Sequence, residues 1–230
     1  MSSRTVVLVV AKAPVPGRAK TRLTPPASAD QAAEIAAASL LDTVDAVRSV
    51  PSGISAVAWA GELADAPRRE EIAAALEDAT VVAQRGRTFD ARLAAAHADV
   101  GRALPGHPVL QIGMDTPQVT RDLLAASAEP LHAASGPDAV LGPASDGGWW
   151  ALGVREPSCA EVLRSVPMSR SDTGDQTLRA LRAAGLRVEL LPELSDVDTM
   201  VDAQRVAEGV PGSRFAAAVR QVTMSTRSQR

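Results

Sequence analysis

The sequence predicts an α/β protein with a mostly parallel sheet that is covered by helices on both faces. Short β-branched runs alternate with Ala/Leu-rich helical patterns along the chain. The runs are almost continuously apolar, as expected for parallel strands buried on both faces. A length of 230 residues suits one large α/β domain or two small ones, and no repeat or composition shift marks a linker. We therefore expect one domain over residues 1–209 and a frayed Ser/Arg/Gln-rich tail over residues 210–230.

The predicted strands are short apolar runs, and they fall at Val6–Ala11, Ile54–Ala58, Val81–Ala83, Val109–Ile112, Ala139–Leu141, Trp149–Gly153 and Arg187–Leu190. The predicted helices have helical apolar spacing, and they fall at Ser28–Arg48, Pro67–Glu77, Ala91–Arg102, Thr120–Ala128, Ala160–Arg164, Asp175–Ala184 and Thr199–Ala207. Ser28 is a suitable N-cap, as is Thr120 or Asp122. Gly185 is placed as a C-cap glycine.

Composition excludes several classes of protein. The formal net charge of -3 argues against a partner that is a nucleic-acid polymer. One cysteine, Cys159, excludes an internal disulfide, and the scattered His97, His107 and His132 show no metal-ligand spacing. The apolar run Thr5–Ala11 is short for a signal peptide, and nothing approaches the roughly 18 residues of a membrane span. With 46% hydrophobic, 22% charged and only 2% aromatic residues, we expect a cytoplasmic enzyme with an aliphatic core and no membrane partner.

The most unusual stretch is VLVVAKAPVPGRAKTRLTPP, in which cationic side chains follow the first strand. Lys12, Arg18, Lys20 and Arg22 supply charge, and Gly17 lets the backbone approach a ligand closely. Lysine and arginine form charge-assisted hydrogen bonds to phosphate. Because ligands bind outside the carboxyl ends of strands in open parallel sheets, this loop predicts a phosphate-binding site.

Two other interpretations of this loop are open. It is also consistent with a solvated basic turn. A P-loop is the second alternative, because GRAKT is similar to GKT. Ala19 replaces the glycine before Lys20, however, and Pro25–Pro26 prevents a helix from following at once.

A first carboxylate follows the strand Val109–Ile112 in the motif QIGMDTP. Asp115 at this position could hold a divalent metal ion against a phosphate, with Gly113 beside the nucleotide. Its alternative role is to cap the helix that begins near Thr120, or to form a turn at Pro117.

A second acidic motif is GPASDGGWWALG. Asp146 precedes Gly147 and Gly148, which permit positive φ or close approach of a substrate. The alternative is a tight turn before a strand, since Asp-Gly is a common turn dipeptide. Trp149 and Trp150 face opposite sides of that strand, so one is expected in the core while the other could line a pocket.

The third acidic motif is LSDVDTM, where the carboxylates of Asp196 and Asp198 point the same way on an extended segment. Asp198 or Thr199 would alternatively cap the following helix. Together with Asp115, the pair would make an oxygen-ligand cage suited to Mg²⁺ or Mn²⁺. A basic loop and an acidic metal cage together suit chemistry on nucleotide phosphates.

In order and spacing, AKAPVPGRAKTRL, IGMDTP, LGPASDGGWWALG and DVDT resemble the DUF2064 family. This family is grouped with the GT-A glycosyltransferases and is sometimes labelled an arsenosugar-biosynthesis glycosyltransferase. The resemblance covers most of Val6–Ala207. It implies the nucleotide-diphospho-sugar transferase fold, a Rossmann-like three-layer α/β sandwich.

The same superfamily holds molybdenum-cofactor nucleotidyltransferases and the phosphoenolpyruvate guanylyltransferase of the F420 pathway. The latter has a loop that ends Lys-Ser/Thr-Arg-Leu, and this chain is similar there. The resemblance implies metal-binding roles for Asp115, Asp196 and Asp198. The family's serine-rich loop is matched by PMSRSDTGDQT, and the matching positions there are Ser169, Asp172 and Thr173.

The residues favour nucleotidyl transfer, because cations over the β and γ phosphates stabilise the charge of leaving pyrophosphate. The predicted reaction joins a nucleoside triphosphate to a small phosphorylated or carboxylated acceptor, with Lys20, Arg22 and Asp115 as the catalytic residues. Phosphate contacts come from Lys12, Gly17, Arg18 and Gly113, while Asp146–Gly148 and Ser169–Thr173 face the acceptor. Glycosyl transfer from a nucleotide sugar is the alternative, and a nucleotide-binding regulator without activity is the third possibility.

Overall fold

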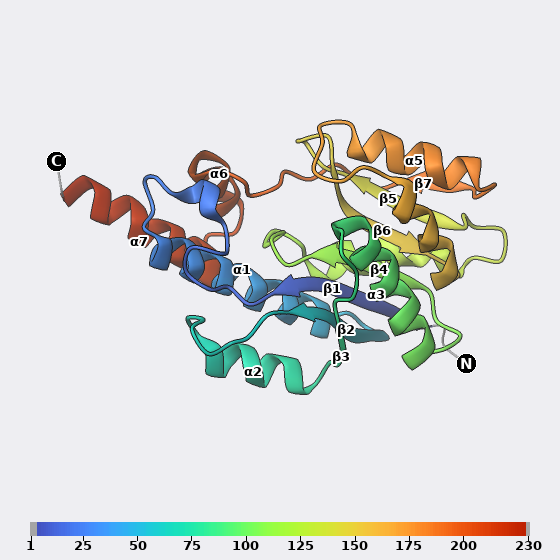
Figure 1. The fold of residues 1–230 in the computed structure, drawn as a ribbon, viewed down its shortest axis with the longest axis horizontal. Coiled ribbons are helices and arrows are strands. Elements are labelled where there is room, and N and C mark those ends of the chain that lie inside the picture. Colours follow the sequence, from blue (N-terminus) through green and yellow to red (C-terminus); the bar gives the residue numbers. More distant parts are fainter. Residues whose placement is uncertain (1–3, 229–230) are drawn as a thin grey trace.

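Seven strands form one sheet in the computed structural model, which describes residues 4–228 (Figure 1). The strand order is β3-β2-β1-β4-β6-β5-β7, and only β6 runs antiparallel to its neighbours among the described strands. The strands are β1 (Thr5–Lys12), β2 (Gly53–Ala60), β3 (Thr80–Ala83), β4 (Val109–Gly113), β5 (Ala139–Pro143), β6 (Trp149–Val154) and β7 (Val188–Leu190). All seven predicted strands and the mostly parallel sheet are confirmed.

The α-helices are α1 (Ala29–Arg48), α2 (Arg69–Glu77), α3 (Phe89–Ala103), α4 (Arg121–Ala128), α5 (Thr173–Ala183), α6 (Met200–Gly209) and α7 (Arg214–Ser228). The 3₁₀ helices are η1 (Thr21–Leu23), η2 (Glu129–His132) and η3 (Pro157–Ser165). The predicted helix at Ala160–Arg164 is therefore wrong in type, since it lies in η3, which begins at a proline and keeps tight i→i+3 turns. No helix within residues 4–228 is long and apolar enough to cross a membrane.

Local signals account for several helix ends. The Ser28 hydroxyl accepts a hydrogen bond from the Gln31 amide, and the Gln31 side chain completes a capping box. The Thr120 hydroxyl caps α4 through the Leu123 amide. Gly185 follows α5 with a φ of 81°, a left-handed conformation that glycine adopts without strain. The predicted caps at Ser28, Thr120 and Gly185 are thus confirmed.

Helices cover both faces of the sheet, and β1 is buried between them. Val7 and Val9 pack toward α1, α2 and α4, whereas Val6 and Leu8 pack toward α3, η3 and α5. Strand β1 is apolar on both faces for this reason, and the core is mostly aliphatic, as predicted.

The loops of interest meet at the carboxyl edge of the sheet. The chain leaves β1 and β4 there, and β5 turns back into β6 at the same edge. After β7, residues 191–199 return across this edge to α6, and Leu194 pairs with Ala144 on the way (Figure 1). This return brings the LSDVD motif next to the loops that follow β1 and β4.

The predicted fraying after Gly209 is wrong for the residues that the structure describes, because residues 214–228 form helix α7. Phe215, Val219 and Val222 have helical spacing and pack with α1 and α6 in a third core. Both oxygens of the α1 residue Asp42 accept hydrogen bonds from the first amides of α7, of which the Phe215 amide lies 2.8 Å away. Helices α6 and α7 therefore add a layer outside α1, and the described part of the tail is folded (Figure 1).

We expect Phe215→Ala to lower the free energy of unfolding by about 3–5 kcal/mol, because it removes a fully buried ring from this third core. Urea denaturation measures the change. Gln221→Ala, at an exposed position of the same helix, is the matched control and should change stability by less than about 0.5 kcal/mol. Equal effects of the two substitutions would contradict the packing of α7 on α1.

Candidate functional site

The loop after β1, residues 13–24, is held by two buried residues that flank its functional side chains. Ala19 packs into the core beneath α1, and Leu23 packs into the third core with α6 and α7. Between them Lys20 adopts a left-handed conformation with φ 47° and ψ 41°. A non-glycine residue in this conformation is strained, and such strain is common at functional sites. Gly17, with a φ of 72°, supplies the other left-handed residue of the loop.

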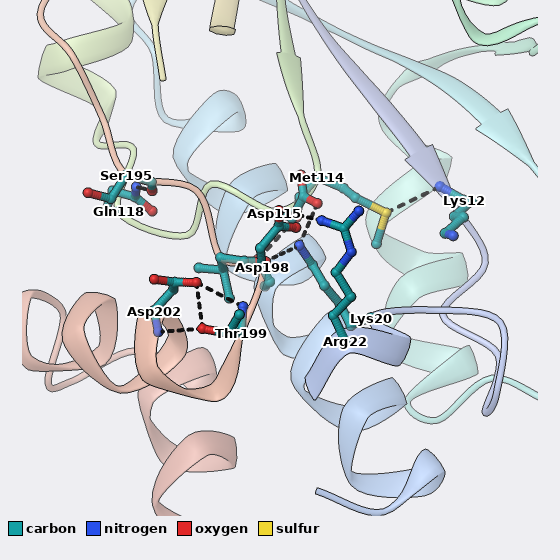
Figure 2. Close-up of polar contacts among 12 residues, drawn as sticks. Lys12, Lys20, Arg22, Met114, Asp115, Gln118, Ser195, Asp198, Thr199 and Asp202 are labelled. Carbon is teal, nitrogen blue, oxygen red and sulfur yellow. Dashed lines mark hydrogen bonds and ion pairs between the residues drawn. The ribbon is translucent and has the colours of Figure 1, made fainter. Parts of the chain in front are cut away.

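Two of the loop's cations bind the predicted metal carboxylates directly (Figure 2). The Lys20 ammonium lies 2.6 Å from Oδ2 of Asp115 and also donates to the carbonyl of Val197. Arg22 Nη1 lies 2.8 Å from Oδ2 of Asp198. Each pair joins positions that are far apart in the sequence. The cationic loop therefore forms one site with the motifs that carry Asp115 and Asp198.

The other two cations are arranged differently. The Lys12 ammonium donates to the carbonyl of Arg18 at 2.9 Å, which folds the loop back over the end of β1. Within residues 4–228 the Arg18 guanidinium has no hydrogen-bond or ion-pair partner. A pocket of about 200 Å³ is lined by Lys12, Arg18, Ala19, Lys20, Thr21, Arg22, Ala36, Met114, Asp115 and Asp198. The predicted phosphate-binding cations therefore share one concave surface.

Two alternatives for this loop fail. The solvated-turn interpretation fails because the Lys20 side chain is only 13% exposed and is bound on two sides. The P-loop interpretation fails because a 3₁₀ turn follows Lys20, and α1 begins only at Ala29.

Asp115 is positioned by the loop that follows β4. The Met114 carbonyl accepts a hydrogen bond from Ser39 Oγ at 3.1 Å, and its sulfur accepts one from the Lys12 amide at 3.3 Å. A Cβ at Gly113 would lie 2.8 Å from Asp115 Oδ1, so glycine makes room for the carboxylate. Burial opposes ionisation of Asp115, but Lys20 beside it holds the pKa of this carboxyl below its ordinary value. Because Thr120 caps α4, Asp115 is not the helix cap.

Asp196 and Asp198 lie on the segment that returns from β7. Thr199 and Asp202 form the capping box of α6, so Asp198 is not needed as a cap. Burial, together with the negative charges of Asp115 and Asp146, raises the pKa of Asp196 to about 7. Three carboxylates thus act on one another electrostatically at this edge of the sheet.

We expect Asp196→Asn to stabilise the unliganded protein at pH 8, because it removes a charge that is poorly solvated in the fold. The folded-state pKa of Asp196 lies above its unfolded value, so its favourable contribution is complete near pH 4 and is lost as pH rises through about 7. The gain in Tm of the variant over wild type should therefore shrink as pH falls from 8 to 4. Thermal unfolding across this range, without added metal, checks the trend, and a pH-independent difference would contradict it.

The β5–β6 turn carries Asp146. Its Oδ1 accepts a hydrogen bond from the Gly148 amide at 2.7 Å, so the tight-turn interpretation describes its local contacts. Gly147 has a φ of 87°, and a Cβ there would lie 1.8 Å from the carbonyl oxygen of Ser171. The loop over residues 166–172 therefore packs directly on this turn, and only glycine allows the contact.

The residues of that loop that were predicted to contact the acceptor substrate mostly form hydrogen bonds within the loop and to the start of α5. Asp172 accepts hydrogen bonds from Arg170 and Gln176, and Thr173 is buried with its hydroxyl donating to the Pro167 carbonyl. Ser169 is exposed with a φ of 61°. Their contact with an acceptor stays a prediction.

The two tryptophans of the GPASDGGWWALG motif, Trp149 and Trp150, both have structural contacts. Trp150 is buried, and its Nε1 donates to the Pro192 carbonyl at 2.9 Å. Trp149 packs against the core on the face of the sheet that α3, η3 and α5 cover, and its Nε1 donates to Oγ1 of Thr177 on α5 at 3.1 Å. Trp149 is not among the residues that line the phosphate pocket.

Sequence reasoning missed two groups at this site. One is the carbonyl of Val197, which a sequence does not display as a ligand. The other is Gln118, whose Nε2 donates to the Ser195 carbonyl at 2.5 Å (Figure 2). The sequence offered one signal for Gln118: it lies in the loop after a predicted strand, three residues beyond Asp115.

The donor set suits a hard cation, since it consists of carboxylate and carbonyl oxygens. The Lys20 ammonium already bridges the Asp115 carboxylate and the Val197 carbonyl, so these oxygens accept a cation between them. Within residues 4–228, however, no group of three or more His, Cys, Asp or Glu side chains stands close enough together to hold a metal ion. The Mg²⁺ or Mn²⁺ site therefore stays a prediction.

The sheet order and the site at its carboxyl edge define the nucleotide-diphospho-sugar transferase fold. A crystal structure from Desulfovibrio desulfuricans G20, provisionally named a nucleotide-diphospho-sugar transferase, is 26% identical with a TM-score of 0.83, and 98% of each chain is covered. A CMP:2-keto-3-deoxy-manno-octonic acid synthetase complexed with CTP is 12% identical with a TM-score of 0.56, covering 90% of this chain and 98% of that one. A cytidylyltransferase from Leptospira borgpetersenii is 12% identical with a TM-score of 0.54, covering 98% and 96%. The last two show the fold alone.

The profile of DUF2064, described as an uncharacterized protein conserved in bacteria, matches residues 43–170. The chain belongs to the DUF2064 family. The search of curated proteins gives no match.

Proposed function

We propose that the protein is a metal-dependent nucleotidyltransferase, which joins a nucleoside triphosphate to a small phosphorylated or carboxylated acceptor. The observation that carries this proposal is the shared pocket of the loop cations and two of the acids. Two observations on other proteins of this fold support the proposal: the D. desulfuricans G20 protein is named a nucleotide-diphospho-sugar transferase, and the CMP:2-keto-3-deoxy-manno-octonic acid synthetase is complexed with CTP. A larger open hollow of about 590 Å³ beside the loop is lined mainly by acidic residues and arginines, which suits phosphate less well.

In the proposed reaction an acceptor oxygen attacks the α-phosphorus, and the bond from that phosphorus to the bridging oxygen breaks. Pyrophosphate leaves with the electron pair of that bond. Arg18, whose guanidinium has no partner among the described residues 4–228, makes the first contact with the phosphates, and Lys12 and the Gly17 backbone lie beside it. Lys20 and Arg22 stabilise the charge that develops on the leaving group. An ionised acceptor needs no general base, so its alignment with the α-phosphorus is the main requirement.

The acids would hold the metal that accompanies the triphosphate. Asp115, Asp196 and Asp198 would bind Mg²⁺ or Mn²⁺, which neutralises charge on the phosphate oxygens. Lys20 and Arg22 must leave these carboxylates before they can reach phosphate. On binding, the metal would take the place of Lys20 and Arg22 at the carboxylates, and the two freed cations would bind the triphosphate. Metal and triphosphate are therefore expected to bind cooperatively.

Glycosyl transfer from a nucleotide sugar is the second candidate, and the name of the D. desulfuricans protein favours it. In that reaction the leaving group is a nucleoside diphosphate, so the cations would have to stabilise only the charge of a diphosphate. The number of loop cations that line the pocket favours the larger charge of pyrophosphate.

Pyrophosphate release tests the choice. The protein is incubated with Mg²⁺, one nucleoside triphosphate at a time, and a mixture of small phosphorylated and carboxylated acids. We expect pyrophosphate from one triphosphate only, and only with metal and acceptor present. Release of nucleoside diphosphate from a nucleotide sugar, without pyrophosphate from any triphosphate, would instead establish glycosyl transfer.

A further inference from the structure

The third core contains one buried residue from each of two loops that meet at the phosphate pocket. Leu23, the last residue of η1, directly follows Arg22 in the loop after β1. Val197 directly precedes Asp198 on the segment that returns from β7. The ion pair between Arg22 and Asp198 therefore joins two positions whose sequence neighbours are packed in the same apolar cluster.

Helices supply the rest of the third core. Helix α6 begins directly after the acidic segment and contributes Met200, Ala203 and Val206, while α7 contributes Phe215 and Val219. Among residues 4–228, the buried members of this core belong to neither of the two cores that lie on the sheet. Figure 1 shows the loop after β1, drawn in blue, beside α6 at the end of the molecule where α7 also lies. The support of the two loops therefore depends on α6 and α7 as well as on the sheet.

Helix α7 is docked on α1 by charge as well as by packing. Asp42 of α1 accepts hydrogen bonds from the backbone amides of Arg214 and Phe215, at 3.3 and 2.8 Å. The Arg214 guanidinium also forms ion pairs with Asp42 and Asp45. A carboxylate at the first amides of a helix is favourable, because it offsets the positive end of the helix dipole. The start of α7 is therefore fixed to α1, and the helix continues from there along the third core.

We infer that α7 is a positioning element for the phosphate pocket, which acts by completing the third core around Leu23 and Val197. Leu23 fixes the chain directly after Arg22. The Val197 carbonyl accepts a hydrogen bond from the Lys20 ammonium, so its position affects a second cation of the pocket. If these two cations were loosely held, they would have to be ordered when phosphate binds, and this cost would weaken binding. The inference rests on the proposed function, because it takes phosphate to be the ligand of this pocket.

The test compares Val219→Ala on α7 with Val100→Ala on α3. Both substitutions remove the same methyl groups from a buried site, but Val100 lies in the core on the other face of the sheet. Calorimetry measures the Kd of pyrophosphate without metal, and hydrogen exchange measures the opening of residues 20–27 and 195–199.

We expect Val219→Ala to raise the pyrophosphate Kd by about 3- to 30-fold, the range over which substitutions away from a site usually act on it. It should also speed hydrogen exchange in both loops. Val100→Ala, which is independent of the pocket, should change the pyrophosphate Kd by less than about 2-fold. It should leave exchange in the two loops as in wild type.

The outcomes separate this inference from the proposed function. Equal weakening by the two substitutions would mean that binding follows overall stability, and an unchanged Kd in Val219→Ala would mean that the pocket does not depend on α7. Either result would refute the positioning role and leave the proposed function intact. Wild type that does not bind pyrophosphate would overturn the proposed function, whereas faster exchange of both loops in Val219→Ala alone would still support their attachment to α7. If Val219→Ala does not fold, Arg214→Met is measured in its place, because it breaks the ion pairs to α1 without making a cavity.

Discussion

Asp115→Asn is expected to lower turnover by about 10³-fold or more, because the metal that it would hold stabilises transition-state charge by several kcal/mol. The amide cannot replace the anionic ligand, although it has the same shape. The same substitution releases Lys20 and removes a negative charge from the pocket. Pyrophosphate should therefore bind Asp115→Asn more tightly than wild type when metal is absent. Steady-state kinetics and metal-free calorimetry measure the two effects.

Asp122→Asn is the matched control for this variant, since it neutralises an aspartate whose side chain is 84% exposed at the start of α4. It should leave both turnover and pyrophosphate binding unchanged. Full activity of Asp115→Asn would refute the metal assignment. Weaker metal-free binding of pyrophosphate would refute the claim that Asp115 competes with phosphate for Lys20.

Lys20→Met is expected to weaken triphosphate binding by about 10- to 100-fold, because charge-assisted hydrogen bonds contribute about 1.5–3 kcal/mol each. It also leaves the Asp115 carboxylate without its ammonium partner. We therefore expect Mn²⁺ alone to bind this variant more tightly than wild type, since the metal no longer competes with Lys20. Calorimetric titrations with Mn²⁺ and with a triphosphate measure both changes.

Arg182→Met, at an exposed position of α5, is the control for loss of one positive charge. It should shift neither titration beyond what a change in net charge produces at physiological salt. Parallel weakening of metal and triphosphate binding in Lys20→Met would mean that Lys20 supports the fold of the site. The proposed exchange of partners would then be wrong.

The strands and the edge at which the site forms were predictable because their signals are local. Buried parallel strands require continuous apolar runs, and the rule that ligands bind at carboxyl ends placed Asp115 beside the cationic loop. The cap of α6 could not be decided from sequence, since Asp198 and Thr199 are adjacent at the start of that helix and both residue types form N-caps.

Contacts between distant segments were not predictable in the same way. Lys20 and Val197 are 177 positions apart, and a backbone carbonyl is the same group at every residue. Helix α7 was missed because its apolar residues lie in a polar segment, and only packing on α1 and α6 makes Phe215 a core residue. The side chains of Asp172 and Thr173 can bond either to their own loop or to a ligand. Their residue types alone therefore did not show that their contacts in the structure are within the loop.

Thermal unfolding with Mg²⁺ or Mn²⁺, against a panel of nucleoside triphosphates and nucleotide sugars, tests the central claim without knowledge of the acceptor. A ligand at about 100 times its Kd stabilises the fold by about 2.7 kcal/mol, which raises Tm by roughly 5–10 °C for a protein of this size. We predict a metal-dependent shift with one triphosphate and none with nucleotide sugars. A shift with a nucleotide sugar alone would contradict nucleotidyl transfer.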